Sequence, residues 1–266
     1  MKFLLSSLLL IIAQIANSQC IDKITTFKPG EKITYDAYYN WGFIWIHAGD
    51  VQFTVSQKMY MSRNLLYLEA TGNSLKSYDW LYKVRDRFQS LVDPQTFSPV
   101  WAERNTLEGS YKAYENYVFN PNGMIYSMVE NSKKPFKRDS LKAPPCTFDV
   151  LSMIYYARAL NFEKYKPNEK IPLKSVVDNQ MFPLFLRYQG KETIKARDGK
   201  KYRCIKFTAL LIEGTIFKGG EDMTIWVTDD DNRIPVLVEA KILIGSVKAY
   251  LNNVEGASYE MKALVK

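Results

Sequence analysis

The sequence predicts a mainly β fold in which internally duplicated, curved antiparallel sheets form a half-barrel or a barrel-like sandwich with one connector helix. Strand-like alternation of apolar and polar residues runs through most of the chain, a set of motifs recurs in the same order, and a single long segment has helical spacing. The predicted parts are a signal peptide at 1–18, a first β repeat at 19–134, a basic connector and helix at 135–162, and a second β repeat at 163–266.

The first 18 residues have the features of a secretory signal: Lys2 at the start, an apolar run, and Ala16-Asn17-Ser18 as small residues for cleavage. We therefore expect an exported, periplasmic protein. The apolar run is shorter than the roughly 20 residues that a transmembrane helix needs, and no later stretch reaches that length. Lipidation of Cys20, with anchoring to the outer membrane, is the alternative, but Gln19 stands where a lipoprotein signal has a small residue.

Both repeats contain β-branched and aromatic runs of strand length. The clearest are ITYDAYY, VQFTVS and LLYLEAT in the first repeat and IKFTALL, MTIWVT and VLVEAKILI in the second. Pro121-Asn122-Gly123 and Asp198-Gly199 predict tight hairpin turns between strands. A short helical turn is expected within 74–82.

Three pairs of matching segments indicate the duplication. They are FKPGEKI at 27–33 with YKPNEKI at 165–171, LVDPQTFSPVWAE at 91–103 with VTDDDNRIPVLVE at 227–239, and GSYKAY at 109–114 with GSVKAY at 245–250. Ordered matches at nearly constant offsets imply an internal repeat. Since a strongly bent sheet cannot cover its own concave face, we expect the second copy or the connector helix to cover it.

The connector helix is predicted at about 147–160, with Thr147 as its cap and Asp149 in the first turn, where a negative charge suits the helix dipole. The residues expected to face the sheet are Val150, Ile154 and Ala157, with Leu151 and Tyr155 beside them.

The basic segment KKPFKRDSLK at 133–142 precedes this helix, in a chain whose formal net charge is +8. We expect it to be a solvated connector, with peripheral contact to an anionic lipid or polymer surface as the functional alternative. The chain has no recognisable nucleic-acid-binding motif, so nucleic acid is not an expected partner.

The chain resembles a family of exported bacterial proteins catalogued as domain of unknown function 3108. The resemblance lies in FKPGEKITYDAYYNWGFIWIHAG, SYDWLYKVRDRF, PPCTFDVLSMIYYARAL and EGTIFKGGEDMTIWVTDDDNRIPVLVEAKILIGSVKAY. It implies export and the fold class, but no functional residues, because the family has no established activity. The Asp…Pro-Val-x-x-Glu pattern at 92–103 and 227–239 is also similar to strands of periplasmic lipoprotein carriers, which are half-barrels with an apolar lining.

His47 is the only histidine of the chain. The sequence around it shows no second imidazole, cysteine or carboxylate cluster at ligand spacing, so no metal site is predicted. Strict alternation places it on one face with Phe43, Trp45, Val51 and Phe53, which is typical of a hydrogen-bonded core histidine rather than a catalytic base. Without a nucleophile elbow or a phosphate-binding loop, the sequence favours a non-enzymatic protein without a cofactor.

Weak catalytic candidates come from the duplication, which pairs Asp86 with Asp222 and Glu103 with Glu239. Two facing carboxylates are the minimal machinery for glycoside hydrolysis, although ordinary cross-strand ion pairs explain such residues equally well. A carbohydrate-active enzyme is therefore one alternative function.

Cys146 and Cys204 are candidates for a disulfide in an oxidising compartment, and the alternative is that all three cysteines are small buried hydrophobes.

The main binding candidates are the clustered side chains Tyr39, Trp41, Phe43, Trp45 and His47, which could line a ligand cleft or belong to a sheet core. The leading hypothesis is a non-enzymatic periplasmic protein that binds or carries an apolar or amphipathic cell-envelope molecule between its sheets. A cell-envelope scaffold or assembly partner is the other alternative.

Overall fold

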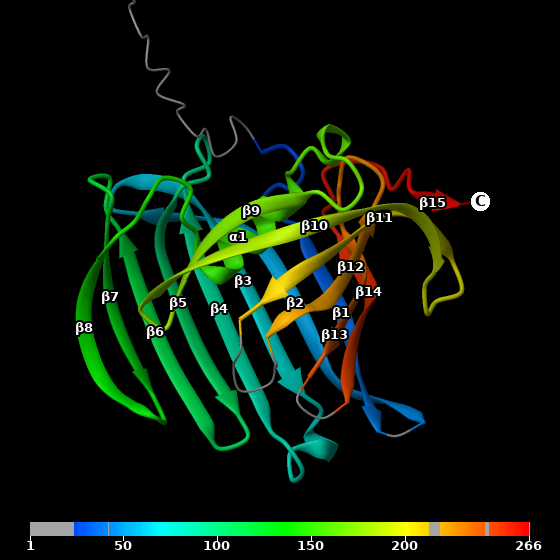
Figure 1. The fold of residues 1–266 in the computed structure, drawn as a ribbon, viewed down its shortest axis with the longest axis horizontal. Coiled ribbons are helices and arrows are strands. Elements are labelled where there is room, and N and C mark those ends of the chain that lie inside the picture. The colour runs from blue at the N-terminus through cyan, green and yellow to red at the C-terminus, as the bar shows by residue number, and fades with distance from the viewer. Residues whose placement is uncertain (1–23, 42, 213–218, 243–244, 266) are drawn as a thin grey trace, which may run out of the picture.

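The structure, a computed structural model, describes residues 24–41, 43–212, 219–242 and 245–265. These residues form one strongly curved antiparallel sheet around a single α-helix (Figure 1). The predicted mainly β, barrel-like class with one helix is confirmed, although the two copies share one continuous sheet. The predicted signal peptide and Cys20 lie outside the described residues.

The elements follow one another along the chain with mostly short turns between them. The strands are β1 (Lys32–Trp41), β2 (Ile44–Tyr60), β3 (Arg63–Ser74), β4 (Val84–Val92), β5 (Pro99–Glu108), β6 (Tyr111–Phe119), β7 (Met124–Asn131), β8 (Lys134–Lys142), β9 (Lys170–Val177), β10 (Gln180–Lys195), β11 (Lys201–Leu211), β12 (Gly220–Thr228), β13 (Pro235–Lys241), β14 (Ser246–Glu255) and β15 (Leu264–Val265). The helix α1 is Val150–Arg158, and short 3-10 helices lie at Lys76–Tyr78, within the expected 74–82 turn, and at Phe162–Lys164.

The strand order is β8-β7-β6-β5-β4-β3-β2-β1-β14-β13-β12-β11-β10-β9, with β15 paired to β11. Strands β9 to β14 repeat β1 to β6 in the same order, so the two copies lie head to tail and join where β1 pairs with β14. The equivalent pairing of β9 with β6 would close a symmetric barrel. That edge of β6 is instead paired with β7, and the sheet stays open.

The turn between β9 and β10 bridges the open side through side chains. Asn179 accepts a hydrogen bond from Ser127 at 2.6 Å and donates one to Asp139 at 3.0 Å. Asp178 forms an ion pair with Lys134. The first and last parts of the sheet are therefore held together by polar contacts and by the packing of Val176 and Met181 against Tyr117 and Ile125, rather than by strand pairing.

The connector helix lies inside the curve, in contact with β3, β4 and β9 (Figure 1). Its cap is Asp149, which accepts hydrogen bonds from the backbone N–H groups of Leu151 and Ser152, so the prediction of Thr147 as the cap is wrong. Thr147 bonds to the carbonyl of Pro144 instead. Asp149 is the better cap of the two because its carboxylate also accepts a hydrogen bond from Ser90 of β4. This bond connects the start of the helix to the sheet.

The predicted packing face of α1 is displaced around the helix. Leu151, Tyr155 and Arg158 are buried, whereas Ile154 is exposed. The helix packs between two parts of the sheet. Its buried face therefore follows Leu151, Tyr155 and Arg158, which are four and three residues apart, rather than Ile154.

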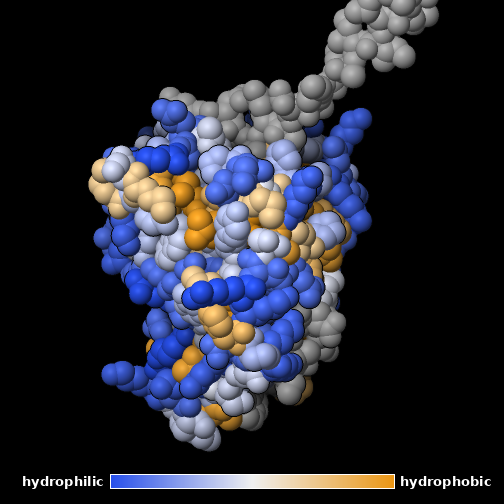
Figure 2. Space-filling view, turned by 90° about the vertical axis from the view of Figure 1, so that its left-hand side faces the viewer, coloured by the Kyte–Doolittle hydropathy of each residue, from blue (hydrophilic) through white to orange (hydrophobic). Residues whose placement is uncertain are grey.

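The basic segment is not an irregular connector, because Lys134–Lys142 forms the edge strand β8. Lysines and a proline on an outermost strand oppose pairing with another chain, so the composition suits a protected sheet edge. The surface on this side of the molecule is mainly hydrophilic (Figure 2).

No helix among the described residues is long and apolar enough to cross a membrane.

Candidate functional site

Side chains fill the concave face of the sheet. Phe27, Phe97, Phe148 and Tyr155 form one core cluster under the first copy, and a second cluster around Phe162 packs under the second copy. An interior cavity between β4, β5, β6, α1 and β9 has a volume of about 10 Å³, room for about one water molecule. The expected ligand cleft between the sheets is therefore occupied by the protein's own aromatic side chains in the described part of the chain.

The ligand-lining candidates gather instead at the β1–β2 hairpin. Phe43, in the turn, is fully exposed, and Ile44 beside it is 66% exposed. Trp45 is half-buried, with the ammonium group of Lys248 4.8 Å from its ring. Tyr39 is half-buried in β1, and the side chain of Trp41 lies outside the described residues.

The β3–β4 connection exposes a second group of apolar side chains. Trp80 is 82% exposed, and Leu81 and Tyr82 are also exposed. In an antiparallel meander, the β1–β2 and β3–β4 turns lie at the same end of the sheet, at the bottom of Figure 1. We refer to Phe43, Ile44, Trp80, Leu81 and Tyr82 as the apolar rim.

Exposed lysines lie at the same end of the sheet as the apolar rim. Lys76 and Lys83 flank it in the β3–β4 connection, and Lys112 and Lys133 lie at the same end, beside the β5–β6 and β7–β8 turns. All four residues are exposed, and none forms an ion pair within the described parts of the chain. This end of the molecule combines exposed aromatic side chains with exposed lysines that form no ion pair among the described residues.

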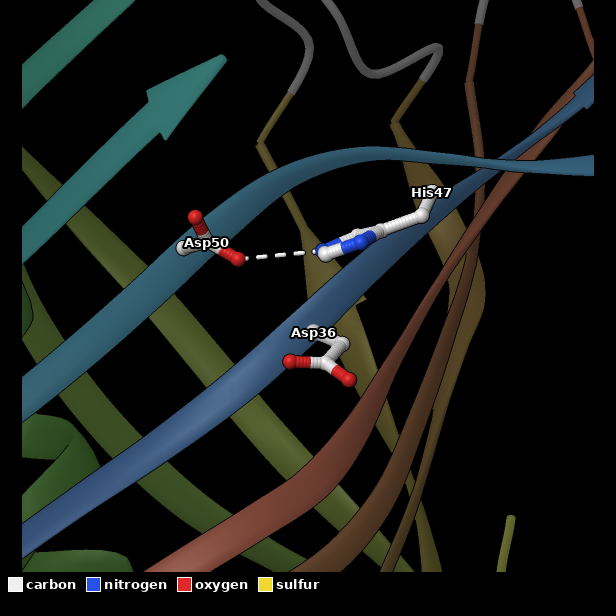
Figure 3. Close-up of side chains that lie close together, drawn as sticks. All are labelled: Asp36, His47 and Asp50. Carbon is white, nitrogen blue, oxygen red and sulfur yellow. Dashed lines mark hydrogen bonds and ion pairs between the residues drawn. The ribbon is translucent and has the colours of Figure 1, made fainter. Parts of the chain in front are cut away.

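A polar cluster lies on the same hairpin, on the sheet face opposite the helix. His47 Nε2 lies 3.0 Å from Asp50 Oδ1 and 3.1 Å from the carbonyl oxygen of Gly49 (Figure 3). Asp36, on β1, is directly opposite Asp50 in the strand register and accepts a hydrogen bond from Asn252 of β14. One ligand atom from each of Asp36, His47 and Asp50 lies within 4.8 Å of the others.

A β-bulge creates this cluster. The register shifts between Ala37 and Tyr38, which pair with Gly49 and His47, so Ala48 is the extra residue. The predicted alternation of His47 with Val51 and Phe53 is therefore wrong. His47 is part-exposed on the opposite face, where its ring stacks on Tyr38, rather than in the core.

Gly49 is required where the strands approach each other. A Cβ atom there would lie 2.4 Å from the carbonyl oxygen of Asn73, so no larger residue fits without a shift of the backbone. Beside the cluster, a surface cleft of about 300 Å³ is lined mainly by polar residues. Its polar lining includes Asp36, Asp50, Gln52, Asn73 and Asn252.

The duplicated carboxylates are separated in the sheet. Five strands lie between β4, which carries Asp86, and β12, which carries Asp222. Asp222 pairs with Lys241, and Glu239 pairs with Lys248. Glu103 accepts hydrogen bonds from neighbouring side chains of β5 and β6. Each carboxylate is thus bound within its own copy, and the separation of β4 from β12 keeps Asp86 and Asp222 out of the two-carboxylate arrangement of a glycosidase.

Asp86 has a local acidic partner. It accepts a hydrogen bond from the backbone N–H of Leu107, and burial, reinforced by the carboxylate of Glu108, raises the pKa of Asp86 to about 7. Like charges held this close disfavour simultaneous ionisation.

The predicted Cys146–Cys204 disulfide does not form. Cys204 is a free thiol, fully buried in β11 against Tyr202 and Trp226. Cys146 is disulfide-bonded and packs against the core cluster of the first copy. The two cysteines thus belong to different clusters, and burial raises the pKa of the Cys204 thiol to about 12, as in an inert structural cysteine.

Sequence reasoning missed the buried ion pair between Arg158 and Glu31. The guanidinium group donates to both carboxylate oxygens, at 2.7 and 2.9 Å, and to the carbonyl oxygen of Asn232 at 3.0 Å. The helical spacing could have predicted that Arg158 is buried. Arg158 lies three residues after Tyr155 and seven after Leu151, on the same face of α1.

Comparisons with known proteins agree with this fold. The model of a family described as "Protein of unknown function (DUF3108)" matches residues 34–252. No curated protein matches the chain. Among solved structures, the crystal structure of a β-barrel-like protein of domain of unknown function DUF1849 from Brucella abortus is similar to this chain, with a TM-score of 0.53 and 8% identity. The alignment covers 88% of this chain and 99% of that chain, and at this identity the likeness extends to the fold alone.

Proposed function

The chain belongs to the DUF3108 family, and we propose that it is a non-enzymatic, exported protein of the cell envelope whose apolar rim binds an anionic lipid surface. The observation that carries this proposal is the gathering of exposed Phe43, Ile44, Trp80, Leu81 and Tyr82 at one end of the sheet. Several large apolar side chains exposed at one end of a protein are typical of interaction surfaces.

The filled interior of the curved sheet supports binding of lipid at the outer surface of the protein rather than inside it. A carrier that encloses a lipid needs a cleft of several hundred cubic ångströms, whereas the interior cavity between the helix and the first copy holds about 10 Å³. An enclosed lipid cargo and an external lipid surface involve the same amphipathic chemistry, and the filled core favours the surface.

The charges around the rim favour an anionic partner. Lys76, Lys83, Lys112 and Lys133 are exposed and carry no ion pair within the described residues. Each lysine near an anionic membrane surface contributes about 1 kcal/mol, and each large apolar side chain that leaves water contributes about 1.5–3 kcal/mol. Aromatic tips with flanking lysines therefore suit the boundary between headgroups and acyl chains.

Co-sedimentation with lipid vesicles tests the proposal. We expect the folded chain to bind vesicles that contain phosphatidylglycerol more tightly than vesicles of phosphatidylcholine alone. The double variant Phe43→Ser/Trp80→Ser should bind at least tenfold more weakly. The matched control is Met59→Ser/Met61→Ser, which removes two exposed apolar side chains from the β2–β3 turn at the opposite end of the sheet.

Charge reversal separates the contribution of the lysines to vesicle binding from that of the apolar side chains. Lys83→Glu/Lys133→Glu should weaken binding to phosphatidylglycerol vesicles and leave binding to phosphatidylcholine unchanged. Failure of the unsubstituted chain to bind either vesicle, or equal binding by the rim variant and the methionine control, would overturn the proposal.

A further inference from the structure

We propose that Asp36, His47 and Asp50 form a binding site for one divalent transition-metal ion of the zinc class. Their ligand atoms already lie within 4.8 Å of one another. Zinc bonds to imidazole nitrogen and carboxylate oxygen are about 2.0–2.2 Å long, which places tetrahedral ligand atoms roughly 3.4 Å apart. His47 Nε2 and Asp50 Oδ1 are 3.0 Å apart, which is already closer than this spacing. To complete the site, the Asp36 side chain rotates so that its carboxylate oxygen approaches these two atoms.

The charge balance at this point of the sheet gives an independent reason for a cation. Asp36 and Asp50 are directly opposed on neighbouring strands, an arrangement in which like charges repel. Within the described residues, Asp36 has Asn252 as its hydrogen-bond partner and Asp50 has His47, and neither forms an ion pair with lysine or arginine.

Several other carboxylates on the strands of this sheet have basic partners. Glu69 pairs with Arg87, Asp222 with Lys241, and Glu239 with Lys248. The opposed pair Asp36 and Asp50 departs from this pattern at the one place where the chain also has its histidine. A bound cation would offset the repulsion between the two carboxylates.

The surrounding structure holds the imidazole in position. The bulge at Ala48 turns His47 toward the carboxylates, and the Ala48 carbonyl accepts a hydrogen bond from Leu75. Tyr38 stacks on the imidazole ring, with ring centroids 5.1 Å apart, and the guanidinium group of Arg197 lies 3.9 Å from the centroid of the Tyr38 ring. Restricting the ring in this way lowers the entropy that binding must remove.

The adjoining cleft provides access for the ion. It has a volume of about 300 Å³, and Asp36 and Asp50 both line it. The side chains of Gln52, Asn73 and Asn252 also line the cleft and can hydrogen-bond to water in the remaining coordination positions.

The donor set selects the class of metal. One imidazole and two carboxylates match a three-ligand zinc site that keeps an open position, whereas calcium and magnesium prefer sites built from oxygen ligands alone. The site should therefore bind Zn²⁺ more tightly than Ca²⁺.

Isothermal titration of the chain, purified without a polyhistidine tag, tests the inference with Zn²⁺ and Ca²⁺ as probes. We expect one Zn²⁺ per chain and at least tenfold weaker Ca²⁺ binding. His47→Asn and Asp36→Asn should each lower Zn²⁺ affinity at least tenfold. Glu239→Gln is the control, since Glu239 is a carboxylate on the same sheet with a lysine partner.

The single histidine gives a second readout. Imidazole ring signals in a nitrogen-15 NMR spectrum can come only from His47, and Zn²⁺ should shift them at one equivalent. Absence of Zn²⁺ binding, unchanged Zn²⁺ affinity in folded His47→Asn, or preference for Ca²⁺ would overturn the inference. Circular dichroism identifies whether each variant is folded.

Discussion

The two copies use equivalent hairpins in different ways. The β9–β10 turn, Asp178-Asn179, packs against β6, β7 and β8 through polar contacts. In the equivalent β1–β2 turn, no such closure is seen among the described residues, and Phe43 is fully exposed. The exposed aromatic side chain of the first hairpin is therefore available for contact with another molecule.

The charged residues differ between the copies in the same way. Glu31 and Glu169 stand at equivalent positions of the repeated motif, but Glu31 is buried against Arg158, whereas Glu169 is exposed. Asp36 pairs with Asp50 across β1 and β2, while Lys174 pairs with Pro183 across β9 and β10. The duplication thus preserved the strand order, and the candidate metal site belongs to the first copy alone.

Glu31→Gln should have the largest effect on stability, because it leaves the buried guanidinium group of Arg158 without its counter-charge. We expect the free energy of unfolding to fall by about 3–5 kcal/mol. Glu169→Gln, at the equivalent position, should change it by less than about 0.5 kcal/mol because Glu169 is on the surface. Urea denaturation of both variants makes the measurement, and equal losses would contradict the proposed asymmetry.

Replacement of Asn179 should have the next largest effect on the free energy of unfolding. Its positive φ of 59° favours Asn or Gly, and its side chain bonds to Ser127 and Asp139. Asn179→Ala should lower the free energy of unfolding by about 2 kcal/mol, from lost hydrogen bonds and backbone strain. Asn179→Gly avoids the backbone strain, so its free energy of unfolding should fall by less than that of Asn179→Ala.

Phe43→Ser, in the equivalent hairpin of the first copy, is the comparison for Asn179. Because Phe43 is fully exposed, its replacement should leave the free energy of unfolding within about 0.5 kcal/mol of the original. Chemical denaturation of the three variants ranks them. A large loss in Phe43→Ser would show that its hairpin supports the fold in the same way as Asn179 does.

The sequence was sufficient to predict the barrel-like β class, because alternation and ordered repeats depend on residues that are close in sequence or at a fixed offset. It was not sufficient to predict how the sheet is closed. Both edges of the sheet contribute to that closure, where Asn179 meets Ser127 and Asp139, and such contacts have no periodic signal.

The candidate site was only partly predictable for a similar reason. His47 and Asp50 are close in sequence, but one extra residue at Ala48 reverses the alternation and brings them to the same face. Asp36 joins them through the register of β1 and β2, which depends on the turn that connects these strands.

The last comparison concerns the pH dependence of stability at Asp86 and its equivalent Asp222. Burial and the nearby Glu108 carboxylate raise the pKa of Asp86 to about 7 from a usual value of 3.8, so the folded state binds this proton more tightly than the unfolded state. Stability should therefore decrease as the pH rises from about 4 to about 7. Asp86→Asn removes the ionisable group and should raise the free energy of unfolding by roughly 1–2 kcal/mol at pH 8, after allowance for partial solvent access, with little change at pH 4.

Asp222→Asn is the matched control, because Asp222 forms a surface ion pair with Lys241. We expect it to lower the free energy of unfolding by about 0–1 kcal/mol at pH 8. Thermal and urea unfolding at pH 4 and pH 8 distinguish the two variants. A gain in Asp86→Asn that is the same at both pH values would mean that side-chain packing, rather than the shared charge of Asp86 and Glu108, sets the difference between the copies.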